Sequence, residues 1–253
     1  MKTVKYYYFG PQCYGYKYMG EQAKGLAERL NFSYQEIDMS KTTPPKDLYL
    51  PGNIVIDDFT IVYPGSVDQL ELVYKTRSPI KGGTFFKAKP KAKDANIKPL
   101  SENIKDGSII CLPKRVESCE KLNWYKQLSK HTHDNFGYIA YDKNQPVAAV
   151  EFLRQDLIPY QCVKEDKDFL FITCIYNNPE AKKDYRYLLM QRLIEFAKDK
   201  KFSGISVISG VNEPYPNGPR RFFNDLNFEE KFFVGSHLLK YDTDKAIFME
   251  YII

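Results

Sequence analysis

The sequence predicts an α/β protein in two parts, and three observations predict it. Residues 169–198 have the pattern of a strand buried on both faces, then a polar turn, then a long amphipathic helix. The first 75 residues form a separate alternation of strand and helix patterns. Between the two parts lies a lysine-rich stretch with proline and glycine but no apolar face. We therefore expect modules at residues 1–78 and 105–253, joined by a basic linker at 79–104.

The junction of strand and helix near residue 178 is the most informative place in the chain. Residues 169–176 are apolar and β-rich, residues 177–179 break the strand, and apolar side chains then recur at helical spacing. These apolar residues are Leu189, Leu193, Phe196 and Ala197. A helix that begins directly after a strand presents unpaired backbone N–H groups and a positive dipole end. The junction is therefore a candidate site for a pyrophosphate group.

Further elements surround this junction. Strand patterns occur at residues 136–141, 146–153, 204–209, 231–241 and 246–253, and a second helix is expected at 219–226. This order resembles the cofactor-binding core of the GNAT N-acetyltransferases over residues 105–253. The run at 151–160 followed by 169–176 is similar to the YoaP-type subgroup of that family.

The GNAT resemblance implies a mixed, mostly antiparallel sheet, with acetyl-CoA as the cosubstrate. It implies an acyltransferase that moves an acetyl group to a primary amine of a small molecule or peptide. In that family a turn with two glycines grips the pyrophosphate, and bulkier residues stand there in this chain: Lys182, Lys183, Asp184, Tyr185, Arg186 and Tyr187. Phe223 occupies the position at which many members have a tyrosine that protonates the departing thiolate.

The same resemblance assigns the cofactor contacts. In GNAT proteins two central strands splay, and a backbone N–H of one strand bonds the thioester carbonyl. Here the strand at Cys174, Ile175 and Tyr176 would supply that group. The phosphates would meet the turn at residues 182–187, and Asn217 stands near the position of a cofactor-contacting asparagine.

Acetyl transfer requires a neutral amine, a polarised carbonyl and a protonated leaving thiolate. Glu151 is a carboxylate among apolar strand residues, which suits a general base, and the alternative is an ordinary outward-facing residue. Tyr160 and Tyr215 lie in loops from which they could donate the proton. Because the family's glycines and tyrosine are replaced, the second hypothesis is a non-catalytic protein of GNAT fold. It would bind CoA or another protein, and it could form a homodimer through the N-terminal module.

The first 75 residues resemble the thioredoxin fold. Strands are expected at residues 4–9, 32–37, 53–56 and 60–63, and helices at 16–30 and 66–74, with the first two strands parallel. Cys13 lies where thioredoxin-like proteins place their first active-site cysteine, and Leu50-Pro51 matches their cis-proline position. Tyr16 replaces the second cysteine, so dithiol chemistry is not available in this motif. A reactive single thiol and a vestigial binding or dimerisation module both remain open.

Composition narrows the class of protein. The mean hydropathy is -0.48, and no apolar run approaches the ~18 residues of a membrane span. The N-terminus lacks the apolar core of a signal peptide. The five cysteines, at positions 13, 111, 119, 162 and 174, form no close pair, as in reduced cytosolic proteins. We expect a soluble cytoplasmic protein with no membrane partner.

Charge and histidine content argue against two further classes. The net charge of +5 is mild, so it favours anionic ligands without indicating nucleic acid. The basic stretch at residues 75–94 is expected to be solvated, and a basic lip over an acidic ligand is the alternative. The segment 131–134 (HTHD) ends a helical pattern, where histidine favours the dipole, so no metal site is expected.

Overall fold

The computed structural model describes residues 2–62, 65–80, 88–111, 118–128, 135–212, 215–238 and 243–253. It forms two compact units, each with its own hydrophobic core. The first comprises Met1–Phe85, Pro159–Cys162 and Val234–Ala246, and the second Phe86–Ile158, Val163–Phe233 and Ile247–Ile253. The second unit thus begins inside the stretch that we expected to be a linker. In the described ranges no helix is both long and apolar enough to cross a membrane.

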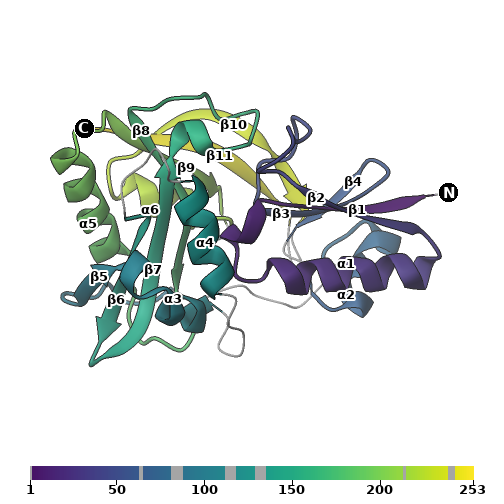
Figure 1. Ribbon diagram of the computed structural model, residues 1–253, viewed down its shortest axis with the longest axis horizontal. Coiled ribbons are helices and arrows are strands. Elements are labelled where there is room, and N and C mark those ends of the chain that lie inside the picture. Colours follow the sequence, from purple (N-terminus) through teal and green to yellow (C-terminus); the bar gives the residue numbers. More distant parts are fainter. Residues whose placement is uncertain are drawn as a thin grey trace. The chain divides into compact units, whose positions relative to one another are not determined.

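The first unit confirms the predicted order of strands and helices. Its elements are β1 (Thr3–Tyr8), η1 (Gly10–Gln12), α1 (Tyr16–Leu30), β2 (Ser33–Asp38), β3 (Gly52–Ile56), β4 (Phe59–Val62) and α2 (Val67–Thr76). Strand β1 pairs in parallel with β2 and antiparallel with β3, which forms a hairpin with β4. The strand order is therefore β2-β1-β3-β4. Both helices cover one face of these strands (Figure 1).

Local sequence explains where these helices begin and end. Helix α1 stops at Asn31, which adopts the left-handed conformation that asparagine tolerates. Helix α2 starts with a capping box between Ser66 and Gln69. In α1 the buried residues Ala23 and Leu26 belong to the core of this unit.

One expectation for the first unit is wrong. The peptide bond between Leu50 and Pro51 is not cis; among the described residues, the cis bond is Tyr215–Pro216. Pro51 nevertheless lies beside the turn of Cys13, because its carbonyl accepts a hydrogen bond from Phe9 N at 3.1 Å.

The second unit contains the predicted strands and helices, together with elements that were not foreseen. Its elements are β5 (Asn96–Pro99), η2 (Leu100–Glu102), α3 (Ile104–Cys111), α4 (Ser118–Leu128), β6 (Gly137–Asp142), β7 (Gln145–Arg154), η4 (Gln155–Leu157), β8 (Phe169–Asn177), α5 (Arg186–Asp199), β9 (Gly204–Gly210) and α6 (Arg220–Asn224). The closing strands β10 (Glu229–Leu238) and β11 (Thr243–Ile252) give residues to both units. Strand β5 lies within the expected linker.

The sheet of the second unit is mixed, as predicted. Strands β5, β6, β7 and β8 pair antiparallel in that order, whereas β8 and β9 pair in parallel. A parallel pair needs a crossover connection, and α5 provides it. Beyond β9 the order continues with β11 and β10.

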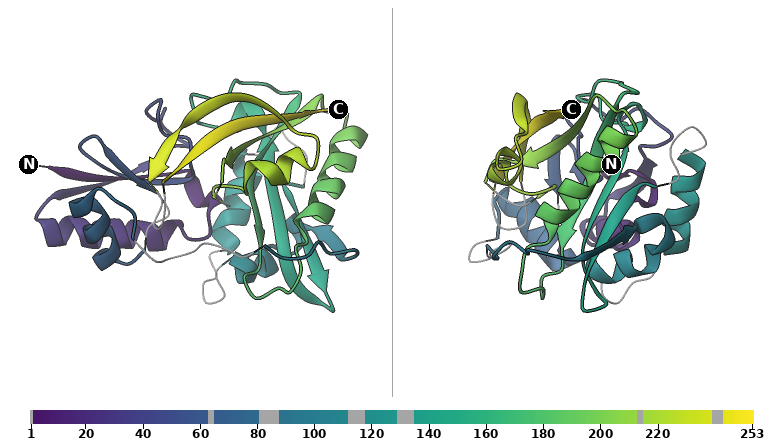
Figure 2. Two further views of the ribbon diagram at one scale, coloured as in Figure 1. Left: turned by 180° about the vertical axis from the view of Figure 1, so that it is seen from behind. Right: turned by 90° about the vertical axis from the view of Figure 1, so that its left-hand side faces the viewer.

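Helices cover both faces of this sheet. Successive residues of a strand point to opposite faces, and Val150 and Glu151 of β7 do so. Val150 belongs to the core cluster that contains Leu189 of α5, whereas Glu151 bonds with Lys121 of α4. Helix α5 therefore covers one face (Figure 2) and α4 the other.

Candidate functional site

Strands β8 and β9 pair over only part of their lengths. Their register runs from Phe169 opposite Gly204 to Ile172 opposite Val207. Strand β8 then continues to Asn177 and β9 to Gly210, without further pairing to each other. The two central strands thus separate toward their carboxyl ends, and the separated part of β8 leads to the start of α5.

The separation starts at an irregularity in β8. The register between β7 and β8 shifts between Glu151, opposite Cys174, and Phe152, opposite Ile172. Beyond it, Ile175 is buried in the core cluster that includes residues of α5. Cys174 and Tyr176 are half-buried, and the Tyr176 hydroxyl donates to the Gly107 carbonyl of α3 at 3.2 Å. The strand segment assigned to the thioester is thus the part of β8 that β9 leaves uncovered.

The turn before α5 uses most of its N–H groups internally. Tyr185 N donates to Asn177 Oδ1 at 3.0 Å, and Arg186 N donates to Asp184 Oδ1 at 3.1 Å. Asp184 N donates to the Pro90 carbonyl at 2.8 Å. In the part of the chain that the structure describes, the first-turn amides of Tyr187 and Leu188 have no acceptor outside the helix.

The bulky side chains at the turn lead away from it. Tyr185 is buried in the core, and its hydroxyl donates to Asp142 Oδ2 at 2.6 Å. Burial raises the pKa of Tyr185 to about 12. Tyr187 packs edge-on against Phe222 of α6 at 4.7 Å, with its hydroxyl 2.9 Å from Asp225 Oδ2. Both rings are therefore packed against neighbouring residues. Lys182 and Lys183 are exposed.

An internal ion pair stands at the N-terminus of α5. The guanidinium of Arg186 donates to the Asp184 carboxylate through Nε at 2.9 Å and through a terminal nitrogen at 2.7 Å. Asp184 is buried, and it places a negative charge where the helix dipole favours one. An anion bound here would compete with this carboxylate.

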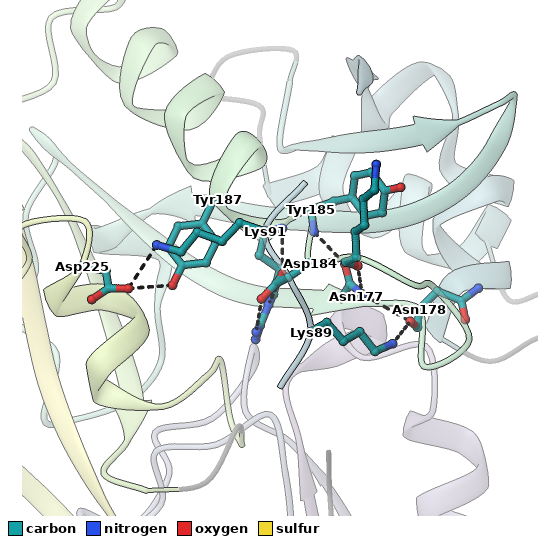
Figure 3. Close-up of polar contacts among 10 residues, drawn as sticks. Lys89, Lys91, Asn177, Asn178, Asp184, Tyr185, Tyr187 and Asp225 are labelled. Atoms are coloured by element: carbon teal, nitrogen blue, oxygen red, sulfur yellow. Dashed lines mark hydrogen bonds and ion pairs between the residues drawn. The ribbon is translucent and has the colours of Figure 1, made fainter. Parts of the chain in front are cut away.

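A short segment before β5 crosses the same turn, as Figure 3 shows. We name residues 89–92 the strap. Ala92 N donates to the Asp184 carbonyl at 2.9 Å, and Lys89 Nζ donates to the carbonyls of Asn178 and Pro179 at 3.0 and 2.5 Å. Lys91 Nζ lies 3.2 Å from Asp225 Oδ2. This part of the expected linker is therefore docked on the turn, although Pro90 and Lys91 stay exposed.

The candidate base Glu151 is completely buried and has three donors. Lys121 Nζ lies 2.7 Å from each carboxylate oxygen, and Tyr125 donates to Oε2 at 2.8 Å. The Tyr176 hydroxyl shares its one hydrogen between the Gly107 carbonyl, at 3.2 Å, and Oε1, at 3.3 Å. The alternative of an outward-facing residue is wrong. A substrate amine would have to displace one of these donors in order to reach the carboxylate.

The other predicted residues divide between the two units. Tyr160 belongs to the first unit, where it is buried and packs edge-on against Phe9 at 6.1 Å. Tyr215 is half-buried in the loop before α6. In the same loop, Asn217 is 4% exposed, and its Nδ2 donates to the Ile208 carbonyl at 3.0 Å. Phe223 is fully buried in the core between Phe222 and Phe228.

Asn217 carries an unusual buried acceptor close to α5. Its Oδ1 atom is buried and has no hydrogen-bond partner among the described residues. A Cβ placed on the neighbouring Gly218 would lie 3.4 Å from a guanidinium nitrogen of Arg186, so this loop adjoins the N-terminus of α5. Gly218 has φ +119°, a conformation that L side chains rarely adopt. An unsatisfied buried amide oxygen indicates a missing partner.

Two expectations concern thiols and metals. Cys13 is half-buried between η1 and α1. The segment 131–134 lies outside the described residues. Within the described ranges, no group of three or more His, Cys, Asp or Glu side chains could hold a metal ion.

Sequence reasoning missed Lys121, Tyr125 and the strap contacts. Lys121 and Tyr125 are spaced i and i+4 on one helix, which places them on the same face. That spacing was the available signal for a polar cluster on α4. The strap offered no comparable signal, because its bridge to Asp184 uses backbone groups and its lysines contact residues that are distant in the sequence.

Comparisons with known proteins found structural likeness without sequence matches. No protein-family model matches this sequence, and a search of curated proteins gave no significant match. Among solved structures, the chain is similar to an N-acetyltransferase from Staphylococcus aureus, with a TM-score of 0.48 at 15% identity over 63% of this chain and 99% of that one.

Two further similar structures were solved with a bound cofactor. One is a GNAT superfamily phosphinothricin acetyltransferase from Sinorhizobium meliloti in complex with acetyl-CoA, with a TM-score of 0.47, 11% identity, and coverage of 63% and 88%. The other is the PaiA N-acetyltransferase from Thermoplasma acidophilum with coenzyme A, with a TM-score of 0.41, 11% identity, and coverage of 63% and 99%.

Proposed function

We propose that the second unit is a GNAT-type domain that binds acetyl-CoA and transfers its acetyl group to a primary amine of a small molecule or peptide. The separation of β8 and β9 beyond Ile172 and Val207 carries this proposal. Beyond this point β8 runs toward the start of α5 without pairing to β9. Such a separation would suit a thioester whose carbonyl lies on β8 and whose phosphates lie at the N-terminus of the helix. The residues at 151–160 and 169–176 remain our reason for proposing the YoaP-type subgroup.

Residues near the N-terminus of α5 support this proposal. Asn217 Oδ1 is a buried acceptor that has no hydrogen-bond partner among the described residues, and its loop adjoins the N-terminus of α5. An N–H of a ligand would satisfy it, and pantetheine amides carry such groups. The amides of Tyr187 and Leu188 would be available to a phosphate oxygen.

The reaction forms an amide C–N bond and breaks the thioester C–S bond. The amine loses a proton on attack, and the thiolate takes one on departure. A backbone N–H at Cys174 or Ile175 would polarise the carbonyl. Tyr215 is our proposed donor to the thiolate, because Phe223 has no proton to give. Glu151 would act on the amine only after the ion pair with Lys121 opens.

The experiment that tests this function has two stages. Isothermal titration of acetyl-CoA and of CoA into the purified chain is expected to give micromolar dissociation constants. Thiol release from acetyl-CoA is then measured with a panel of primary amines, with Glu151→Gln and Tyr215→Phe as variants. No binding at millimolar cofactor would reject the proposal.

A second candidate function is favoured by the Lys121–Glu151 pair. A carboxylate bonded to an ammonium and two phenols is suited to structure as well as to catalysis. We infer that, if cofactor binds without turnover of any amine, the unit is a CoA-binding or interaction protein. Turnover that falls in Glu151→Gln without a loss of folding would reject this alternative.

For the first unit we propose a thioredoxin-like module without dithiol chemistry. The strand order β2-β1-β3-β4 and the place of Cys13 before α1 support it. The rate of Cys13 alkylation by iodoacetamide, measured as a function of pH, distinguishes a reactive single thiol from a vestigial one. An apparent pKa near ~8.5, the free-thiol value, would exclude a reactive thiolate. A markedly lower value would exclude a vestigial thiol.

A further inference from the structure

The strap at residues 89–92 is held on the turn before α5 by a small set of contacts. Its backbone forms one isolated parallel bridge, between Lys91 and Asp184, through two hydrogen bonds. Its side chains add the Lys89 contacts to the carbonyls of Asn178 and Pro179. An isolated bridge of this size, with exposed Pro90 and Lys91, can open at a modest free energy.

The N–H groups of Asp184, Tyr185 and Arg186 are already paired with internal acceptors. The Pro90 carbonyl takes the N–H of Asp184, and the Asp184 carboxylate takes the N–H and guanidinium of Arg186. Lys91 is paired with Asp225, and the hydrogen bonds from the Tyr187 hydroxyl and then from Lys91 hold the pKa of that carboxyl below its usual value. A phosphate that approaches the turn at Asp184 and Arg186 therefore meets donors that already have acceptors, while the Tyr187 and Leu188 amides lie further along the helix (Figure 3).

The strap also links the helices α5 and α6. Lys91 reaches Asp225, which follows α6, and its ammonium lies 3.7 Å from the ring centroid of Tyr187 in α5. The tyrosine hydroxyl bonds to the same Asp225. Opening the strap would release Lys91, Tyr187 and Asp225 together.

We propose that the strap is an internal competitor of the cofactor phosphates, and that coenzyme A binds when residues 89–92 leave the turn. This inference rests on the proposed function and adds its regulation. The Asp184 N–H is freed from the Pro90 carbonyl and becomes available to a phosphate oxygen. The apparent affinity of the chain for coenzyme A is then reduced by the fraction of molecules in which the strap is docked.

The test is titration of CoA into the full chain and three variants: Lys89→Ala, the double variant Lys89→Ala/Lys91→Ala, and Lys93→Ala as matched control. Each variant removes positive charge, so electrostatics alone would weaken binding of an anionic ligand. Lys93 is exposed just beyond the strap. If the strap competes, the Lys89 variants bind CoA roughly fivefold more tightly, as a loss of about 1 kcal/mol of strap docking implies. Lys93→Ala binds equally or more weakly.

Hydrogen exchange gives a second readout that does not depend on these variants. The Ala92 amide is protected by the Asp184 carbonyl, and saturating CoA is expected to accelerate its exchange. Unchanged or weaker binding in the Lys89 variants, or slower Ala92 exchange with CoA, would overturn the competition while leaving the proposed function intact. Failure of every form to bind CoA would overturn both.

Discussion

Lys121 Nζ lies 2.7 Å from both carboxylate oxygens of Glu151, and the two side chains are only 1% and 0% exposed. Helix α4 and strand β7 are therefore joined by a buried ion pair. The Glu151 carboxylate also accepts hydrogen bonds from Tyr125 and Tyr176. Glu151 also stands opposite Cys174, where β8 begins to part from β9. This pair fixes the sheet at the edge of the proposed acetyl site.

Removing one partner of this pair is expected to be strongly destabilising. Lys121→Met would leave a buried carboxylate without its cation, which costs about 3–5 kcal/mol. Adding Glu151→Leu to that variant should recover much of the loss, because no charge is then buried alone. Urea unfolding followed by circular dichroism measures both changes.

A matched control comes from an exposed ion pair. Lys231 lies 2.8 Å from Glu229 in β10, and Lys231→Ala should leave the unfolding midpoint nearly unchanged. Equal effects of Lys121→Met and Lys231→Ala would contradict the assignment of a buried, interdependent pair.

The first unit is expected to lose stability on mild acidification. His237 is buried and bonds through Nδ1 to the Tyr49 hydroxyl at 2.9 Å, and burial lowers its pKa to about 4 from an ordinary 6.5. Asp244 opposes this shift. As the pH falls, His237 therefore takes up a proton near pH 6.5 in the unfolded chain but only near pH 4 in the folded chain. The contribution of neutral His237 to the free energy of unfolding is fully present above pH 6.5. It is lost as the pH falls toward 4, and the loss is about 2 kcal/mol at pH 5.

Unfolding midpoints in urea at pH 8 and pH 5 measure this dependence. His237→Gln removes the titrating group. The difference in the free energy of unfolding between pH 8 and pH 5 should therefore shrink by about 2 kcal/mol. A variant with the same pH dependence as the parent chain would show that other groups cause it. Tyr49→Phe serves as a control, because it removes the hydrogen bond and keeps the histidine.

The sequence predicted the regular elements because their signals are local. The apolar run of β8 and the helical spacing through Leu189 and Leu193 of α5 depend only on neighbours in the chain. Helix α1 has the predicted bounds Tyr16–Leu30. In the structure it ends at Asn31, which adopts the left-handed conformation.

The site was harder to predict because its partners are distant in sequence. Glu151 was identified, but its ion pair with Lys121 spans 30 residues and depends on how α4 docks on β7. The strap has no apolar face, so its pattern indicates a solvated segment. Its docking depends on Ala92 N and the Asp184 carbonyl, which are backbone atoms that every sequence possesses.

Restoring the tyrosine of the GNAT resemblance is not expected to restore proton donation. Phe223 is fully buried between Phe222 and Phe228. A hydroxyl placed there without a partner costs about 1–3 kcal/mol. Phe223→Tyr should therefore lower the melting temperature and leave thiol release from acetyl-CoA unchanged. Faster thiol release would show that the ring reaches the thiolate and would contradict a purely core position.

Asn217 is expected to bind the cofactor through its unpartnered oxygen. Asn217→Ala removes that acceptor together with the bond from Nδ2 to the Ile208 carbonyl. A single hydrogen bond contributes about 0.5–1.5 kcal/mol, so the dissociation constant for CoA should rise by up to about tenfold. Asn224→Ala, which truncates an exposed asparagine in α6, is the matched control and should bind as the parent does. A variant at 217 that melts earlier but binds CoA with unchanged affinity would assign Asn217 to the structure of the loop alone.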